Sequence, residues 1–456
     1  MKPEHRFALV LAVLTLLLFS PTWSHQMLFW DDDVNVLQNP LVTQPGMQGF
    51  KSIFTSIFST DYYPIKYLSL AVDHWVWGGR FVGYHVTQTL LHALNAGLLL
   101  LLLFRWTKNL PVAVTVAVWF AWHPVQVESV AWIAERKNVL GTCFVLLAWL
   151  AYPRRRLLAL LCFTLAALSH ALVIVMPALL FWYEVYRERT PWRTAVQRTW
   201  LFFVPAAFAA VMRVLGHQES SQLAENFPSV WNWTRTMFQV LGEYLTTLVW
   251  PVRLNNFYVE RASTAGLLAA VGWATVWGWA IKRERRWGWF ALGWFLIALL
   301  PVLQLVPHPT VRADRYLYLA MLGPFLLLAL SLPARAVKVV GVVGAVWFAT
   351  LTMLRLPDWK DGKTLWTDSV KKDPNSAMAH FSVAGYAVGE RDFQTAEFHA
   401  REAVKLNPRF ADAQERLGAI LLMRGNTGEA RVHLERALEL KPTLVDARRN
   451  LELLNR

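Results

Sequence analysis

Long apolar stretches alternate with short charged clusters along most of this chain. A helix of about 20 apolar residues crosses a bilayer, and a shorter one crosses where neighbouring helices bury it. The stretch 234–250 stays ambiguous, because it is amphipathic and carries Arg235 and Glu243. The pattern predicts an all-α, polytopic transmembrane bundle. Its expected spans number about 11 and cover residues 7–23, 86–104, 110–122, 138–152, 157–169, 170–186, 198–216, 264–282, 287–306, 316–332 and 336–355.

Composition agrees with this pattern. Hydrophobic residues make up 55% of the 456 positions, and charged residues only 17%, against roughly 25% in soluble domains. The net charge of +14 is typical of basic cytoplasmic loops, so we expect no nucleic-acid partner. Residues 21–24 form a poor signal-peptidase site, which favours a retained first helix. Cys143 and Cys162 both lie in apolar runs, against a disulfide framework or a thiolate metal site.

The basic clusters predict the orientation. With the N-terminus in the cytoplasm and 234–250 not spanning, every short basic cluster lies inside. If 234–250 spanned, the cluster at 282–286 would lie outside. The outer side then receives the loops 24–85, 123–137, 217–263 and 307–315, and everything after residue 356. Short loops favour a bacterial inner membrane with a periplasmic outer face, and the endoplasmic reticulum lumen is the eukaryotic alternative.

The C-terminal part contains a repeat. Asp373-Pro374, Asn407-Pro408 and Lys441-Pro442 recur every 34 residues, and small residues recur at the same interval. This period predicts two tetratricopeptide repeats, 377–410 and 411–444, followed by a capping helix. We therefore expect a transmembrane domain at 1–356, an amphipathic connection at 357–376 and a short α-solenoid at 377–456. The solenoid is either a stabilising cap or a concave surface that binds peptide.

Three adjacent aspartates, Asp31, Asp32 and Asp33, follow the first apolar stretch. Adjacent carboxylates at a bilayer surface repel each other and lose solvation energy. Such a cluster commonly faces a metal ion, a cation or a proton that is transferred. The alternative is a solvated loop in which aspartates cap helices. The residues alone leave both interpretations open.

Charged side chains also gather in two other outer segments. The loop 123–137 contains Glu128, Glu135, Arg136 and Lys137, which are costly near lipid unless paired or hydrated. The segment 308–316 contains Arg312 and Arg315, on the side that the positive-inside rule disfavours. These basic residues either hold a phosphate or pair with nearby carboxylates. His170, between two apolar runs, is a proton carrier or a satisfied buried histidine, and we favour the second.

The sequence gives no support for soluble nucleotide chemistry. The chain has no Gly-rich phosphate loop, metalloprotease His pair or serine-hydrolase elbow. A reaction at the outer face needs a preactivated donor, because no ATP is present there. A lipid-linked phosphate suits a carboxylate and arginines at the bilayer edge. The carboxylate would deprotonate an acceptor hydroxyl, and the cations would stabilise the leaving phosphate.

The chain resembles the GT-C class of membrane glycosyltransferases that carry C-terminal tetratricopeptide repeats, which are related to the protein O-mannosyltransferases. The resemblance covers nearly the whole chain. The residues that carry it are the motif 30–33 with Asn39-Pro40, the segments 63–69 and 85–95, the loop 123–137, the segment 313–318 and the repeats.

The resemblance implies a polyprenyl- or dolichyl-phosphate sugar donor and a hydroxyl acceptor, often a protein Ser or Thr. It implies an aspartate of the first-loop motif as the base. By their spacing to Asn39, Asp31 and Asp32 resemble the family's acidic pair, and we expect Asp32 to be the base, with Asp31 aiding acceptor binding or holding a metal. The expected donor-phosphate residues are Arg136, Lys137, Arg312 and Arg315. The expected substrate-binding residues are Asp33, Tyr63, Lys66, His123, Glu128 and Tyr316.

We expect no required cofactor, although a divalent ion at Asp31 and Asp32 is possible. The expected partners are the lipid-linked donor, membrane lipids and a protein or peptide acceptor that the repeats select. Two alternatives stay open. One is an en bloc oligosaccharide ligase acting on a protein or pilin, and the other is a non-enzymatic membrane scaffold whose repeats recruit an envelope assembly machine.

Overall fold

The computed structural model describes residues 1–28, 30–44, 46–58, 62–216, 230–259, 263–283, 285–303 and 310–454. Throughout these ranges the regular structure is helical, with no β-strand, which confirms the all-α fold class. Residues 217–229, 260–262 and 307–309 of the predicted outer loops lie outside the described residues, as do residues 304–306 at the end of the predicted span 287–306. The chain divides into two compact units, Met1–Leu254 with Arg261–Trp359, and Asn255–Glu260 with Lys360–Arg456.

The first unit is a helical bundle with short loop helices. Its elements are α1 (Pro3–Phe19), η1 (Ser20–Ser24), η2 (Asp33–Leu37), α2 (Pro40–Thr43), α3 (Met47–Thr55), α4 (Pro64–Trp77), α5 (Phe81–Thr107), α6 (Leu110–Trp122), α7 (Gln126–Ala131), η3 (Ile133–Glu135), α8 (Arg136–Ala151), α9 (Arg156–Ala167), η4 (Ala171–Val175), α10 (Met176–Tyr186), α11 (Trp192–Gly216), α12 (Val230–Val249), α13 (Thr264–Arg283), α14 (Arg285–Leu299), η6 (Leu300–Val302), η7 (Asp314–Tyr316), α15 (Leu317–Ala320), α16 (Leu322–Ser331), α17 (Ala334–Arg355) and η8 (Leu356–Trp359).

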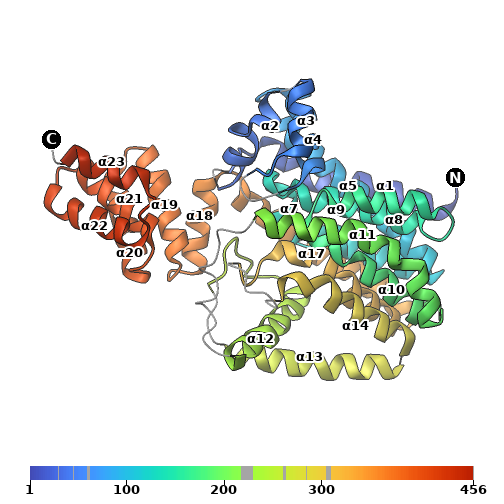
Figure 1. Cartoon of the computed structure of the whole chain (residues 1–456). Coiled ribbons are helices and arrows are strands. Elements are labelled where there is room, and N and C mark those ends of the chain that lie inside the picture. The colour runs from blue at the N-terminus through green and yellow to red at the C-terminus, as the bar shows by residue number, and fades with distance from the viewer. Residues whose placement is uncertain are drawn as a thin grey trace. The chain divides into compact units, whose positions relative to one another are not determined.

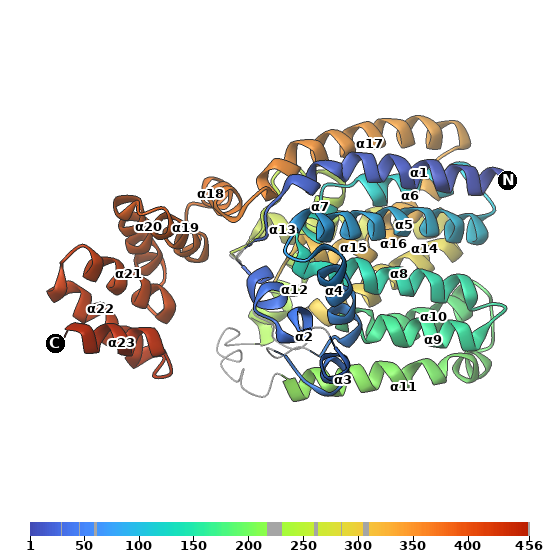
Figure 2. The same ribbon diagram turned by 90° about the horizontal axis from the view of Figure 1, so that it is seen from above.

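The long helices run side by side. Helix α1 packs on α5, α5 packs on α6 and α8, α8 packs on α9, and α6 packs on α17, as Figure 2 shows. Within the part of the chain that the structure describes, five helical stretches are long and apolar enough to cross a membrane: Pro3–Ser24, Phe81–Thr107, Trp192–Gly216, Thr264–Arg283 and Ala334–Trp359. Shorter apolar helices lie between them, so the count of about 11 spans stays a prediction.

The helices of the first outer loop lie at one end of the bundle. Figures 1 and 2 both show α2, α3 and α4 at the end opposite the N-terminus. Helix α2 begins after Asn39, whose side chain accepts a hydrogen bond from the backbone N–H of Leu41 at 2.9 Å. Asn39 satisfies an otherwise unpaired N–H, and Pro40 suits the first helical position. The Asn39-Pro40 pair is therefore a helix start.

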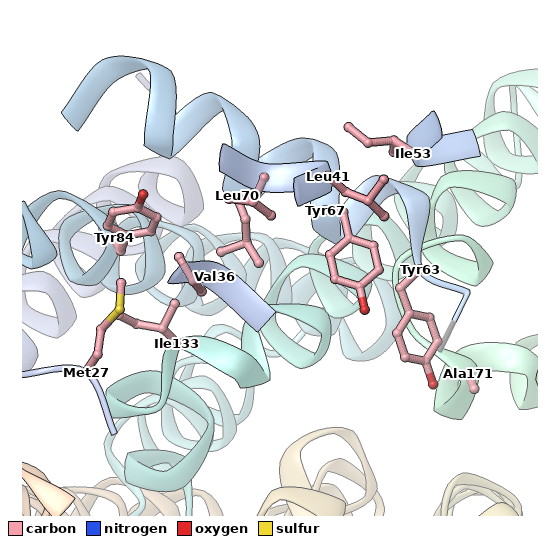
Figure 3. Close-up of a cluster of buried hydrophobic side chains, with 11 residues drawn as sticks. Met27, Val36, Leu41, Ile53, Tyr63, Tyr67, Leu70, Tyr84, Ile133 and Ala171 are labelled. Atoms are coloured by element: carbon pink, nitrogen blue, oxygen red, sulfur yellow. The ribbon is translucent and has the colours of Figure 1, made fainter. Parts of the chain in front are cut away.

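A buried apolar cluster fixes this loop to the bundle. Figure 3 shows side chains of the loop meeting Ile133 and Ala171, which come from later in the chain. The cluster consists of Met27, Val36, Leu41, Val42, Ile53, Tyr63, Tyr67, Leu70, Tyr84, Ile133 and Ala171. Burial of side chains of this size stabilises by roughly 1.5–3 kcal/mol each. The loop that carries the aspartates is therefore held in a fixed position.

Helices α12 and α13 cross closely through two glycines. A Cβ atom on Gly242 would lie 2.1 Å from the carbonyl oxygen of Gly266 and 2.5 Å from the backbone nitrogen of Ala270. Only a residue without a side chain permits this approach. The ambiguous stretch 234–250 is thus a helix, but whether it spans the membrane stays open.

The second unit consists of helical pairs that repeat. Its helices are α18 (Gly362–Lys372), α19 (Ala377–Gly389), α20 (Phe393–Leu406), α21 (Ala411–Met423), α22 (Thr427–Leu440) and α23 (Val445–Leu454). Helix α19 packs on α20, and α21 packs on α22. Small buried residues recur every 34 positions at Gly362, Ala396 and Ala430, where helices pack closely. The assignment to tetratricopeptide repeats, and the domain boundaries, stay predictions.

One hydrogen bond also repeats with this period. Side chains 380, 414 and 448 each bond to the carbonyl oxygen of the proline six residues earlier: His380 to Pro374, Gln414 to Pro408 and Arg448 to Pro442, all at 3.0 Å. In the first pair of helices, Nδ1 of His380 lies 2.8 Å from Nδ1 of His399. In the second pair, Gln414 Oε1 lies 2.7 Å from Nδ1 of His433.

Candidate active site

Asp32 joins two outer loops. Its Oδ2 atom accepts a hydrogen bond from the backbone N–H of Leu28 at 2.9 Å, and its Oδ1 atom accepts one from the backbone N–H of Ala134 at 2.7 Å. The side chain is fully buried. Burial raises the pKa of Asp32 to about 7, although the two N–H donors oppose the shift. With both oxygens occupied by main-chain donors, Asp32 mainly holds the loops together.

A stack of aromatic rings lies over the same junction. The rings of Trp30 and Trp132 are stacked, with centroids 4.3 Å apart and an interplanar angle of 10°. The guanidinium of Arg315 lies over the Trp132 ring at 5.5 Å from its centroid. Three segments distant in sequence therefore meet, and aromatic stacking with a cation stabilises the arrangement.

Asp31 is the exposed carboxylate of this site. It is solvent-exposed, and no described residue forms a hydrogen bond with its carboxylate. The surrounding protein removes part of the hydration of this carboxylate, and that desolvation raises the pKa of Asp31 above its ordinary value, while the nearby Lys137 and Lys66 oppose the shift. Glu135 and Arg315 also act on it electrostatically. Asp31 therefore lies near cations from three other segments and keeps its oxygens available.

Two cations share one carboxylate. Oε1 of Glu135 lies 3.2 Å from Nζ of Lys137 and 3.6 Å from Nε of Arg315. Arg315 also pairs with Glu128, which accepts a hydrogen bond from the Arg315 backbone N–H at 3.0 Å. Burial lowers the pKa of Arg315, but Glu128 and Glu135 outweigh it and raise the pKa above its ordinary value. Arg315 is therefore a permanent cation held in place by carboxylates.

Lys66 and Tyr63 each contact a residue from another segment of the chain. Nζ of Lys66 donates a hydrogen bond to Oδ1 of Asn35 at 2.6 Å, and Asn35 sits in η2, one turn after the aspartates. The hydroxyl of Tyr63 accepts a hydrogen bond from Arg213 at 3.0 Å. Lys66 of α4 thus adds positive charge near Asp31, whereas Arg213 of α11 contacts Tyr63.

Arg136 lies apart from the charged residues around Asp31. It is fully buried and donates hydrogen bonds to Gln88 at 2.5 Å, Ser69 at 2.9 Å, Asp73 at 2.7 Å and the carbonyl oxygen of Tyr84 at 2.9 Å. A guanidinium with four protein acceptors is committed to structure. This placement argues against the predicted role of Arg136 in phosphate binding.

Three further expected residues take structural positions. Arg312 pairs with Glu243 of α12 at 2.6 Å. His123 is buried, with Nε2 3.2 Å from the carbonyl oxygen of Leu248. Asp33 is the first residue of η2 and is half-buried. The ion pair of Arg312 and the hydrogen bond of His123 do not involve Asp31, and the predicted roles of all three residues stay untested.

Of the remaining expected residues, Glu128 and Tyr316 support Arg315. Glu128 is fully buried and forms its ion pair. The Tyr316 ring lies under the Arg315 guanidinium, 5.1 Å from centroid to cation. Both residues position a cation, and their direct contact with substrate stays a prediction.

The sequence interpretation missed several members of this site. Trp132, Asn35 and Arg213 each contact an expected residue: Arg315, Lys66 and Tyr63, respectively. Their positions along the chain give no sign of these contacts, because the partners are distant in sequence. Glu135 pairs with its neighbour Lys137, in line with the expectation that basic residues pair with nearby carboxylates, but its contact with the distant Arg315 was not foreseen. His170 is buried as expected, yet neither ring nitrogen has a hydrogen-bond partner within the described residues.

The predicted divalent ion at Asp31 and Asp32 stays untested. Across the described ranges, no group of three or more His, Cys, Asp or Glu side chains could hold a metal ion. Both oxygens of Asp32 already accept backbone hydrogen bonds. These two residues therefore fit an ion poorly, and the chemistry below uses none.

Comparison with known proteins gives the chain its relatives. No protein-family model matches it. A protein O-mannosyl-transferase of Caenorhabditis elegans is 23% identical over 428 residues, which are 84% of this chain and 60% of that protein. Protein O-mannosyl-transferase TMTC1 is 32% identical in Mus musculus and 30% in Homo sapiens over 137 residues, 28% of this chain and 14% and 16% of those proteins. The chain thus spans about 60% of the length of its worm relative. It is a relative of proteins named protein O-mannosyl-transferases.

Proposed function

We propose that this chain is a membrane glycosyltransferase that moves a sugar from a polyprenyl-phosphate donor to a protein Ser or Thr hydroxyl at the outer face of the membrane. One observation carries the proposal. The exposed Asp31 lies within electrostatic reach of Lys137 and Arg315, which meet at a single carboxylate. A base thus lies beside cations that suit a phosphate. The names of the relatives support the sugar-transfer class.

In the proposed reaction, Asp31 acts as the base. It takes the proton of the acceptor hydroxyl while the hydroxyl oxygen attacks the anomeric carbon. The bond from that carbon to the phosphate oxygen breaks, and its electron pair stays on the phosphate. Lys137 and Arg315 stabilise the charge that develops there. One displacement with one base inverts the anomeric configuration.

Asp31 replaces Asp32 as the proposed base for a geometric reason. A general base must come within hydrogen-bond distance of the proton that it takes. Asp32 is fully buried and already accepts two main-chain hydrogen bonds, whereas Asp31 is exposed. Asp32 then positions its neighbour by holding residues 28–32 against the loop at Ala134.

Location and partners follow from the same proposal. The chain would lie in a bacterial inner membrane, with Asp31 and the repeats on the periplasmic side. The basic clusters of the alternate loops support this orientation. The repeats would select the protein acceptor, and membrane lipids would surround the bundle. No metal ion or other cofactor is proposed.

A direct assay tests the proposal. The purified full chain is incubated with acceptor peptides and a panel of synthetic short-chain polyprenyl-phosphate sugars, and the peptides are examined by mass spectrometry. We expect one monosaccharide on Ser or Thr from one donor, and loss of the product with Asp31→Asn. Transfer of whole oligosaccharides from lipid diphosphates would identify an en bloc ligase instead. Absence of transfer from every donor would contradict the proposal.

A further inference from the structure

Glu135 occupies an unusual place among the charges of the site. A single oxygen, Oε1, contacts both Lys137 and Arg315. The side chain is 2% exposed, and its other oxygen, Oε2, has no hydrogen-bond partner within the described residues. A carboxylate held only to pair cations commonly uses both oxygens. Here one oxygen takes the position between two cations that an oxygen of a bound phosphate would need.

Glu135 stays ionised in this position. Burial alone would raise the pKa of Glu135, but Lys137 and Arg315 outweigh burial and lower it. A bound phosphate therefore competes with a fixed negative charge for the same cations. Asp31, close to the same cations, adds further negative charge.

The competition depends on the charge of the ligand, and this argument rests on the proposed function. A lipid-phosphate sugar is a phosphodiester with one negative charge. When the bond to the sugar breaks, the electron pair stays on the phosphate and the product is a monoester. A monoester carries about −1.5 to −2 at neutral pH. The reaction thus raises the negative charge at the cations, and by itself this favours retention of the product.

We propose that Glu135 promotes product release. In the resting protein its Oε1 atom takes the position of a phosphate oxygen between Lys137 and Arg315. Because Coulomb repulsion scales with ligand charge, Glu135 disfavours the monoester product about twice as strongly as the diester donor, in free-energy terms. It is a positioning residue of the phosphate site, and it lets the cations stabilise the leaving group without retaining it.

Binding measurements on the full chain in detergent test this proposal. The probes are farnesyl phosphate, a monoester, and farnesyl methyl phosphate, a diester, with affinities from calorimetry at pH 8. Glu135→Gln keeps the size of the side chain and removes its charge. We expect it to bind the monoester about tenfold more tightly than wild type, and the diester only about threefold more tightly.

Repeating the affinity measurements at pH 5 distinguishes the proposed role of Glu135 from a purely structural one. At pH 5 the monoester is protonated once, because its second pKa is about 6. The Gln variant should then gain only about threefold for both ligands. The matched control is Glu390→Gln, which removes an exposed partner of Lys363 in the repeats and should change neither affinity.

Several outcomes would overturn the proposal. Equal tightening of both ligands at pH 8, or weaker monoester binding to the variant, shows that Glu135 only holds the cations in place. If Glu135→Gln does not fold, Glu135→Asp withdraws the carboxylate by one methylene, and an unchanged monoester affinity contradicts the idea. Failure of both ligands to bind wild type would reject the proposed lipid-phosphate donor itself, which is a different result.

Discussion

Oδ1 of Asp32 accepts a hydrogen bond from the backbone N–H of Ala134 at 2.7 Å, across 102 positions of sequence. This contact ties the first outer loop to the loop before α8. It also bears on which aspartate is available for chemistry. Both carboxylate oxygens of Asp32 accept main-chain hydrogen bonds, whereas its neighbour Asp31 is exposed.

Asp31→Asn tests the assignment of the base. We expect transfer to fall by at least about 100-fold, because general base catalysis is lost, while the thermal unfolding midpoint stays unchanged. Rates from the mass-spectrometric assay and a melting curve in detergent measure both. Gly272→Ala, on α13 with no atom within 4 Å of the added methyl group, is the control. Wild-type transfer by Asp31→Asn would reject the assignment.

Asp32→Asn tests how much the two backbone hydrogen bonds of Asp32 stabilise the fold. The amide presents only one acceptor, so one buried N–H, of Leu28 or Ala134, loses its partner. An unsatisfied buried donor costs about 1–3 kcal/mol. We expect a lower unfolding midpoint and faster limited proteolysis in residues 24–85. Unchanged stability would show that the two backbone bonds contribute little.

The contribution of Asp32 to the stability of the protein should depend on pH. The pKa of Asp32 is about 7 in the folded protein, and that of an unfolded aspartate is about 4. Between these values the folded state binds the additional proton, so this group stabilises less as pH rises through the window. The gap in melting temperature between wild type and Asp32→Asn should therefore be wider at pH 5 than at pH 8. A melting-temperature gap that is wider at pH 8 than at pH 5 would contradict this prediction.

Transfer itself should fall in acid. Asp31 must be ionised to accept a proton, and its pKa is raised by burial. The rate should therefore decline as pH falls, with an acidic limb above about pH 4, the ordinary aspartate value. A pH–rate profile at saturating donor measures this limb. An acidic limb at or below the ordinary value would argue against a raised pKa.

Arg136 and Lys137 are neighbours with opposite expected phenotypes. Arg136→Gln breaks a buried pair with Asp73, and breaking such a pair costs about 3–5 kcal/mol. We expect little folded protein. Lys137→Gln should fold normally and lose donor affinity, seen as a higher KM. Size-exclusion profiles and donor titrations separate the two effects, and similar behaviour of both variants would contradict the distinction.

The crossing of α12 and α13 gives a matched pair of glycine variants. Gly242→Ala puts a methyl group into backbone atoms of α13, and these cannot move aside as a side chain can. We expect a clear loss of thermal stability. Gly272→Ala, on α13 with no atom within 4 Å, should be neutral or stabilise by up to about 1 kcal/mol. Equal midpoints for the two variants would exclude the close contact.

Hydropathy and period predicted much of the fold. Runs of apolar residues anticipated the bundle helices, because burial in lipid or among helices needs such runs. The 34-residue interval anticipated the paired helices from α19 to α22. Whether the stretch 234–250 spans the membrane could not be resolved, because it is amphipathic and carries Arg235 and Glu243. Its close glycine contact with α13 joins residues distant in sequence, so no local pattern reveals it.

The composition of the site was partly predictable, but the division of roles was not. The sequence indicated the acidic motif and the basic residues at 136, 137, 312 and 315. It could not choose between Asp31 and Asp32, because main-chain N–H groups make the difference. It could not separate Arg136 from Lys137, because the phase of α8 turns the first side chain into the bundle. Adjacent helical residues point about 100° apart.

The histidine contact of the repeats determines the position of one proton. The Pro374 carbonyl can only accept, so Nε2 of His380 carries hydrogen, and in the neutral ring Nδ1 must then accept from His399. If both rings were protonated, two N–H groups would face each other at 2.8 Å. In the next pair of helices, the oxygen of Gln414 accepts whatever the charge of His433. The contact within the first pair of helices thus requires at least one neutral ring, whereas the contact within the second pair holds for either charge of His433.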